Sequence, residues 1–229
     1  MKTQNIVTKN SSPLDKITLF QSLFQGRNDL YLKGFKNQIT QKPGYFPACG
    51  NEWVYGICEK PKIKCSECKH KRFLPLTEDV IRWHLSGHDD TGKEFVLGIY
   101  PLLLDETCFF LVVNFDQPAW QDVIIDFRNT CHTLQIPIAV ERSSSGKGAR
   151  VWIFFSEKIP AILVRKLGSH LVTEAMEHSI NIYFDAYDHL VPSQDTLPQG
   201  SYGNLIALPL QKKARDQGNT LFIDDALLP

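Results

Sequence analysis

The 229-residue sequence predicts an α+β fold. Segments with helical periodicity alternate with short apolar runs rich in β-branched residues, so both helices and strands are expected. Several of these runs are joined by only a few residues, which favours antiparallel strands over a doubly wound parallel sheet. Hydrophobic residues make up 43% of the chain, which at this length is enough for a sizeable core.

The N-terminal part, residues 1–26, is expected to be a polar lead-in followed by one helix. The helix is predicted over residues 13–25, because Ser12 can cap it, Pro13 suits its first turn and Gly26 suits its end. Apolar side chains at helical spacing give this segment one face to bury.

Residues 27–75 are predicted to form a second part, a basic module built from loops. They are rich in Gly, Pro, Lys and Cys and have little apolar periodicity, so the module needs a stabilising cross-link. Residues 76–229 form the larger remainder, and we expect one integrated domain overall. Its predicted elements are, in order, a helix at 78–87, paired strands at 96–104 and 108–116, a helix at 118–134, strands at 138–143 and 149–155, a long helix at 160–178 and a strand at 204–210.

The formal net charge is zero, because 25 Lys and Arg balance 25 Asp and Glu. This balance hides an asymmetry: residues 1–75 hold 13 basic and 5 acidic residues, and residues 76–229 hold 12 basic and 20 acidic ones. Such a division is typical of a protein that binds an anion with its basic end, although chance variation of surface charge explains the count equally well.

The sequence gives no sign of a membrane or secreted protein. It contains no run of eighteen apolar residues, and its first residues lack an apolar signal core. We therefore expect no membrane partner and a cytoplasmic location.

Four of the six cysteines lie close together, with the spacing C-x8-C-x6-C-x2-C. Without a secretion signal the thiols should stay reduced, so a tetrahedral Zn²⁺ of structural type fits better than disulfides. Basic neighbours would favour the thiolate form; they are Lys64, Lys69, Lys71 and Arg72. Four unrelated thiols are the alternative. The predicted zinc ligands are Cys49, Cys58, Cys65 and Cys68.

A polar pair ends one of the predicted strands. Asn114 and Asp116 are two residues apart, so their side chains share a face of the strand. Two carboxylates in such a place would hold Mg²⁺ or Mn²⁺, but one member here is an amide, and a polar turn is the simpler interpretation of this fragment alone. A later acidic loop could complete a metal site with one of its carboxylates, Asp185, Asp188 or Asp195.

A Ser- and Gly-rich hairpin is expected at residues 141–152. Its Lys147 and Arg150, with backbone N–H groups and hydroxyls such as that of Ser145, can contact phosphate oxygens. The segment is not a Walker loop, because a strand rather than a helix follows it.

Together these residues resemble the archaeo-eukaryotic primase superfamily, and most closely the primase-polymerase domain of TOTE conflict systems. The resemblance extends from about residue 13 to residue 225. It rests on these segments: SPLDKITLFQSLFQGR (12–27), GYFPACGNEW (44–53), CEKPKIKCSEC (58–68), YPLLLDETC (100–108), ERSSSGKGARVWIFF (141–155) and YDHLVPSQDTLPQGSYGNLIALPLQ (187–211).

The resemblance implies an RRM-like antiparallel sheet, an inserted zinc-binding module and template-directed joining of nucleotides with two divalent metals. The three acidic positions of the family's metal site correspond to Asn114, Asp116 and Asp188, and the first departs from the family's Asp. The family's nucleotide-binding His corresponds to Arg150, a second departure in the segment that also holds Ser145 and Lys147.

Three functions follow from this reading. The first is a primase-like domain that binds DNA, with nucleoside triphosphate as a further ligand, and with nucleotidyl transfer impaired or lost. The second is an active primase-polymerase that holds Mg²⁺ or Mn²⁺ with Asp116, Asp188 and a further acid, Glu141 or Asp185. The third is a zinc-dependent protein-interaction module. A helicase or nuclease partner is compatible with the first two.

Nucleic acid is expected to bind the basic module at Lys62, Lys64, Lys69, Lys71 and Arg72. Aromatic residues are interleaved with this basic stretch, and some of them could stack bases, while at least half should be local core. They are Tyr31, Phe35, Tyr45, Phe46, Trp53 and Tyr55.

Overall fold

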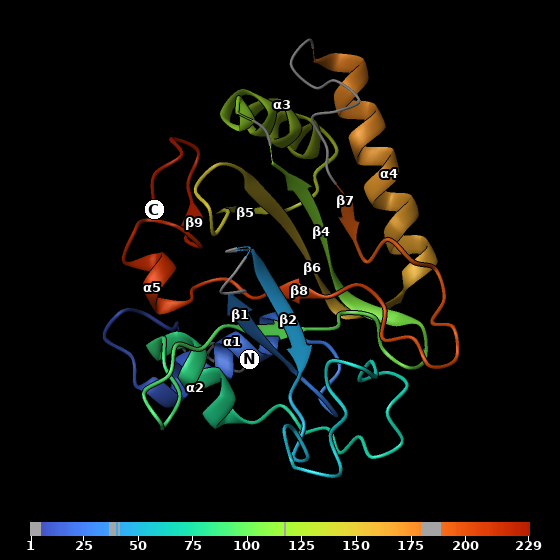
Figure 1. Ribbon diagram of the computed structural model, residues 1–229. Coiled ribbons are helices and arrows are strands. Elements are labelled where there is room, and N and C mark those ends of the chain that lie inside the picture. Colours follow the sequence, from blue (N-terminus) through green and yellow to red (C-terminus); the bar gives the residue numbers. More distant parts are fainter. Residues whose placement is uncertain (1–5, 37–39, 41, 117, 180–188) are drawn as a thin grey trace, which may run out of the picture.

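The computed structural model describes residues 6–36, 40, 42–116, 118–179 and 189–229. Within these residues the fold contains two sheets, and every strand pairing described is antiparallel. Helices α3 (Trp120–Thr133) and α4 (Ala161–His178) cover one face of the larger sheet. The smaller sheet lies on its other side with helices α1 (Pro13–Leu23) and α2 (Glu78–Ser86) (Figure 1). The predicted α+β class with antiparallel strands is confirmed.

The larger sheet has the strand order β7-β4-β6-β5-β9. Its longest strands pair directly, with Asn114 opposite Arg150 and Phe115 opposite Ala149. Side chains of β4 and β6 alternate between the two faces, and both faces are buried, which explains why these strands read as continuous apolar runs. The bounds are β4 Thr107–Phe115, β5 Ala139–Arg142, β6 Ala149–Pro160, β7 His189–Val191 and β9 Phe222–Ile223.

The smaller sheet has the strand order β2-β1-β3-β8. Its first two strands form a hairpin inside residues 27–75, where the sequence indicated only loops. Because β1 also pairs with β3, this part of the chain belongs to a sheet shared with the remainder. The bounds are β1 Leu32–Lys36, β2 Pro43–Pro47, β3 Leu97–Ile99 and β8 Ile206–Ala207.

The helices begin and end close to the predicted positions. Ser12 forms a capping box with Asp15 at the start of α1, and Thr77 caps α2, which ends at Gly87 in the left-handed conformation. Helices α3 and α4 pack their apolar faces on the larger sheet. The bounds are α1 Pro13–Leu23, α2 Glu78–Ser86, α3 Trp120–Thr133, α4 Ala161–His178 and the short α5 Lys212–Arg215.

One predicted pairing is wrong. The runs 96–104 and 108–116 do contain strands, but β3 pairs with β1 and β8, whereas β4 pairs with β6 and β7. Pro101 follows β3 and cannot donate to a ladder, so the chain leaves the smaller sheet there and enters the larger one. The short connection therefore joins two layers instead of forming a hairpin.

No helix in the described ranges has the length and apolar character needed to cross a membrane.

Candidate functional site

A row of polar side chains crosses the larger sheet. His189 of β7 is opposite Asn114 of β4, Asn114 is opposite Arg150 of β6, and Arg150 is opposite Glu141 of β5. Directly opposed residues of an antiparallel sheet point to the same face, so the four side chains lie in one line. This face turns toward the smaller sheet, because its neighbours Val112 and Trp152 pack there.

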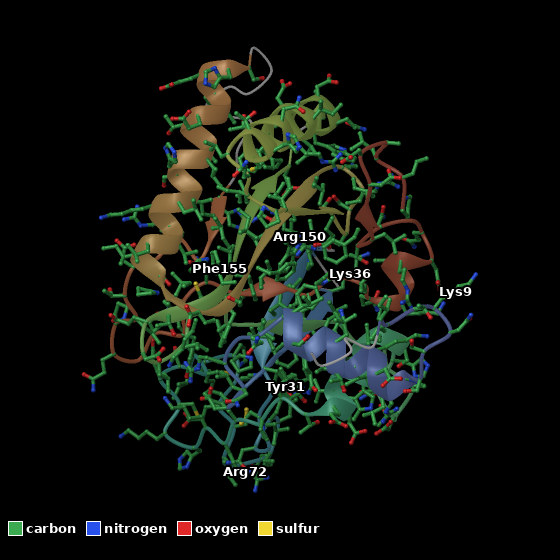
Figure 2. The ribbon with its side chains drawn as sticks, turned by 180° about the vertical axis from the view of Figure 1, so that it is seen from behind. Lys9, Tyr31, Lys36, Arg72, Arg150 and Phe155 are labelled. Carbon is green, nitrogen blue, oxygen red and sulfur yellow. The ribbon has the colours of Figure 1, made fainter. Side chains whose placement is uncertain are left out.

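Arg150 is buried and fully engaged. Its guanidinium donates to the Glu141 carboxylate at 2.9 Å and to the carbonyl oxygen of Ala207 in β8 at 2.7 Å. It therefore ties the larger sheet to the smaller one, and Figure 2 shows it at the centre of the molecule, far from Arg72. The predicted phosphate contact would require this guanidinium to leave both partners.

Glu141 has no exposed surface and accepts hydrogen bonds from Arg150 and from the indole N–H of Trp152, the latter at 2.8 Å. Burial raises the pKa of Glu141 to about 7, against the opposing effects of the Arg150 charge and the Trp152 hydrogen bond. Because both carboxylate oxygens are used inside the protein, Glu141 is not free to hold a catalytic metal, a role expected for it in an active enzyme.

Asn114 is also nearly buried, with 7% of its surface exposed. Its side-chain nitrogen donates to the backbone carbonyl of His189 at 3.3 Å and lies 3.1 Å from the ring Nε2 of the same residue. The amide thus fastens β7 to β4. A carboxylate could not donate either contact.

Asp116 is exposed immediately after the end of β4. The hairpin before β6 packs against it: a Cβ atom added to Gly148 would lie 2.5 Å from the Phe115 carbonyl oxygen and would also collide with the Asp116 carboxylate. Only a glycine allows this close approach of hairpin and acid.

The hairpin satisfies much of its own hydrogen bonding. The backbone N–H groups of Ser143, Gly146 and Lys147 donate to acceptors within the loop, and the acceptor for Lys147 is the Ser145 hydroxyl at 3.2 Å. The Lys147 side chain is exposed, and within the described ranges it has no ion-pair partner. Of the three predicted nucleotide contacts, Lys147 is thus the one whose charge faces solvent unpaired.

The acidic loop is described only in part. Asp185 and Asp188 lie outside the described residues. Asp195 forms an ion pair with Arg165 of α4, and this hydrogen-bonded partner lowers the pKa of Asp195. Asp195 therefore fastens the loop to α4 and is not a candidate metal ligand.

The four cysteines of the module are brought together. All of them line one small cavity of about 20 Å³, and backbone N–H groups of Asn51 and Arg72 donate to the Cys49 sulfur at 3.4 and 3.3 Å. However, the described residues contain no group of three or more His, Cys, Asp or Glu arranged as a ready metal site. The cavity establishes proximity of the thiols, not coordination.

At Cys65 the expected effect of neighbouring cations on the thiol comes from Lys60 and not from the four basic residues that the sequence indicated. Burial raises the pKa of the Cys65 thiol. Among the described residues, Lys60 is the one cation that lowers this pKa, and its effect is smaller than that of burial. The basic residues Lys62, Lys64, Lys69, Lys71 and Arg72 are all exposed, so their charge faces solvent. They stay candidates for binding a polyanion.

Comparison with known families decides the identity. Residues 15–229 match the family model described as "TOTE conflict system, Archaeo-Eukaryotic Primase domain". The chain belongs to this family of primase domains. No curated protein matches the chain. A similar solved structure is the polymerase domain from Mycobacterium tuberculosis ligase D in complex with DNA, at 8% identity and a TM-score of 0.48, covering 86% of this chain and 72% of that chain.

In this primase domain, the sequence indicated Asn114, Asp116 and Arg150 as site candidates but not the ion pair between Arg150 and Glu141. The sequence nevertheless contains a signal for this ion pair. In the hairpin, residues 143 and 148 are hydrogen-bonded across the turn, so 141 and 150 are opposite each other, and the pair carries opposite charges. Burial of both partners could not be read from the sequence, because it depends on β8 of the other sheet.

Proposed function

We propose that this primase domain binds nucleic acid through its basic N-terminal module and that its nucleotidyl transfer is impaired. One observation carries the second part of the proposal. At the first metal position stands an amide, Asn114, whose nitrogen holds His189, so this side chain serves the sheet as a hydrogen-bond donor.

Replacing one carboxylate of a metal site by an amide costs enough free energy to slow catalysis substantially. At an effective dielectric of about 20, a charge contact at about 4 Å is worth roughly 4 kcal/mol. If the amide oxygen recovers half, about 2 kcal/mol is lost, more than tenfold in metal affinity or rate. Among the described residues at the family's metal positions, Asp116 supplies the one carboxylate. The Asn114 amide and the Asp116 carboxylate together are too few anionic ligands to hold two divalent metals.

Arg150 supports the same proposal. The family's nucleotide-binding position is occupied by a guanidinium that already binds Glu141 and Ala207. To contact a phosphate it would leave the buried Glu141 carboxylate without its cation, which is strongly unfavourable. We therefore expect nucleoside triphosphate to bind weakly, through Lys147.

Nucleic-acid binding is supported by family membership and by the exposed basic residues of the module. The Cys49, Cys58, Cys65 and Cys68 thiols line one cavity, and N–H groups directed at the Cys49 sulfur are partners that a metal thiolate requires. This donor set fits a structural Zn²⁺, which would fasten the loop 49–68. The zinc-bound module is part of the proposal.

Primer synthesis and gap filling with Mg²⁺ and with Mn²⁺ test the proposal. We expect no product from the native chain and measurable product from Asn114→Asp. Arg150→His alone would leave the buried Glu141 carboxylate without its cation. The complete test variant therefore combines Asn114→Asp and Arg150→His with Glu141→Gln, which removes the unpaired charge. Robust product from the native chain would instead establish the alternative, an active primase-polymerase.

A further inference from the structure

The tip of the loop between Cys49 and Cys58 presents three large apolar side chains to solvent. Trp53 is 68% exposed, Val54 is 40% exposed and Tyr55 is fully exposed. The other aromatic residues of the basic module are more covered: Tyr31 is buried, Tyr45 and Phe46 are half-buried and Phe35 is 44% exposed. A cluster of adjacent exposed aromatics is uncommon on a soluble surface and marks a place of interaction.

The loop holds these side chains in place by its own turns. Val54 N–H donates to Asn51 O at 3.2 Å, and the N–H groups of Ile57 and Cys58 both donate to Val54 O, at 3.1 and 2.9 Å. Trp53 has a φ angle of +60°, a conformation that is rare for a bulky residue. The chain therefore maintains an unfavourable backbone state while directing an indole outward.

A cation borders this aromatic tip. The Lys60 ammonium lies 5.6 Å from the centre of the Trp53 ring and 4.3 Å from that of Phe46, and it is held by Glu52 at 3.0 Å. Lys60 is mostly buried, so it orients the indole instead of reaching a ligand. Exposed lysines follow within a few residues, at positions 62 and 64. Flat aromatic faces bordered by positive charge fit a polyanion that carries flat rings.

We propose that Trp53 and Tyr55 form a base-stacking platform for single-stranded nucleic acid. The proposal rests on the nucleic-acid binding proposed above and assigns its contact surface. Every base has a π-face, so stacking on these rings tolerates any sequence, while the neighbouring lysines bind phosphates. A duplex hides its base faces, so the platform distinguishes single from double strands.

The test measures affinity for oligo(dT) and for a duplex of equal length, at several salt concentrations, by anisotropy of a labelled strand. Trp53→Ala should weaken oligo(dT) binding about 5- to 100-fold, with the slope of log affinity against log salt unchanged. Tyr55→Ala should act in the same direction, and Trp53→Phe should retain most of the affinity. Lys62→Ala and Lys64→Ala should each reduce the slope by about one.

The matched control is Leu104→Ala, which removes an equally exposed apolar side chain, 70% exposed, outside the module. It should bind as the native chain does. Tryptophan emission gives a second readout: Trp53 is the most exposed of the four tryptophans, so oligo(dT) should quench the native protein and leave Trp53→Phe nearly unquenched. Thermal melting confirms that each variant is folded.

The outcomes separate the two proposals. If the native chain binds oligo(dT) with a steep salt dependence and Trp53→Ala binds within twofold of it, the platform is wrong and nucleic-acid binding stands. Equal losses for single strand and duplex would also overturn stacking. If the native chain binds neither, or its emission responds to anionic vesicles and not to oligo(dT), both proposals fall.

Discussion

Replacing Arg150 with Met removes the cation from the buried pair with Glu141 while keeping an unbranched side chain that can fill much of the same space. In the native chain Glu141 has no exposed surface and both of its oxygens are hydrogen-bonded inside the protein. After the substitution only the Trp152 N–H remains. We expect the resulting loss of stability to increase above pH 7.

The magnitude follows from the carboxyl group. A stranded Glu141 can avoid its charge by taking up a proton, which costs about 1.4 kcal/mol for each pH unit above its ordinary pKa of 4.5. The native Glu141 already carries this cost up to its own pKa of about 7, so the extra charge-related loss in the variant is close to zero at pH 5.5 and about 1.4 kcal/mol at pH 8. The lost bond to Ala207 adds about 1 kcal/mol at any pH.

Stability changes with pH in the direction expected for a carboxyl group whose pKa is raised in the folded state. The folded state of Arg150→Met binds a proton on Glu141 that the unfolded state releases above pH 4.5, so stability falls as pH rises. In the native chain the same trend ends near pH 7, the pKa of Glu141, whereas in the variant it continues above pH 7. Urea unfolding at pH 5.5 and pH 8 measures the difference.

The control is Arg150→Met combined with Glu141→Gln, which keeps the shape of the side chain and removes its charge. This double variant should lose the added pH dependence and should be more stable than Arg150→Met at pH 8. If Arg150→Met is destabilised equally at both pH values, Arg150 and Glu141 do not form a buried pair, and Arg150 is free to contact a phosphate.

Three further predictions concern other parts of the fold. Burial lowers the pKa of His84 to about 4 from 6.5, so the folded state keeps its ring neutral; native stability should fall by about 3 kcal/mol as pH drops from 6.5 to 4, and His84→Gln should lack this loss in denaturant titrations. Gly148→Ala should lower stability by about 1–3 kcal/mol in thermal melts, because its methyl group meets the Phe115 carbonyl and Asp116; unchanged melting would refute the close approach. Cys65→Ser should abolish bound zinc and lower the melting temperature, whereas a native protein without zinc by elemental analysis would contradict the proposed site.

Local signals predicted the helices well. The cap residues Ser12 and Thr77 act only on their own helix ends, so α1 and α2 begin where the sequence indicates. The pairing of β3 was not predictable in this way. An apolar run is compatible with any neighbour, and the choice between β4 and β1 depends on residues far away in the chain.

The candidate site shows the same division between local and distant information. Hydrophobicity and spacing placed Asn114 and Asp116 at the end of one strand. They could not reveal that the Asn114 amide holds His189, since that contact joins strands 75 residues apart. In the basic module, the sequence indicated six aromatic residues but not which of them are exposed. The fold shows that Trp53 and Tyr55 are exposed and Tyr31 is buried.

The most direct test of the central claim follows binding and chemistry in one sample. A labelled primer-template is titrated with the native domain in Mn²⁺ and nucleoside triphosphates, and anisotropy and primer length are recorded together. We predict saturable binding with no extension, and extension once Asn114→Asp, Arg150→His and Glu141→Gln are combined. Extension by the native chain at an occupancy that anisotropy reports would contradict the account.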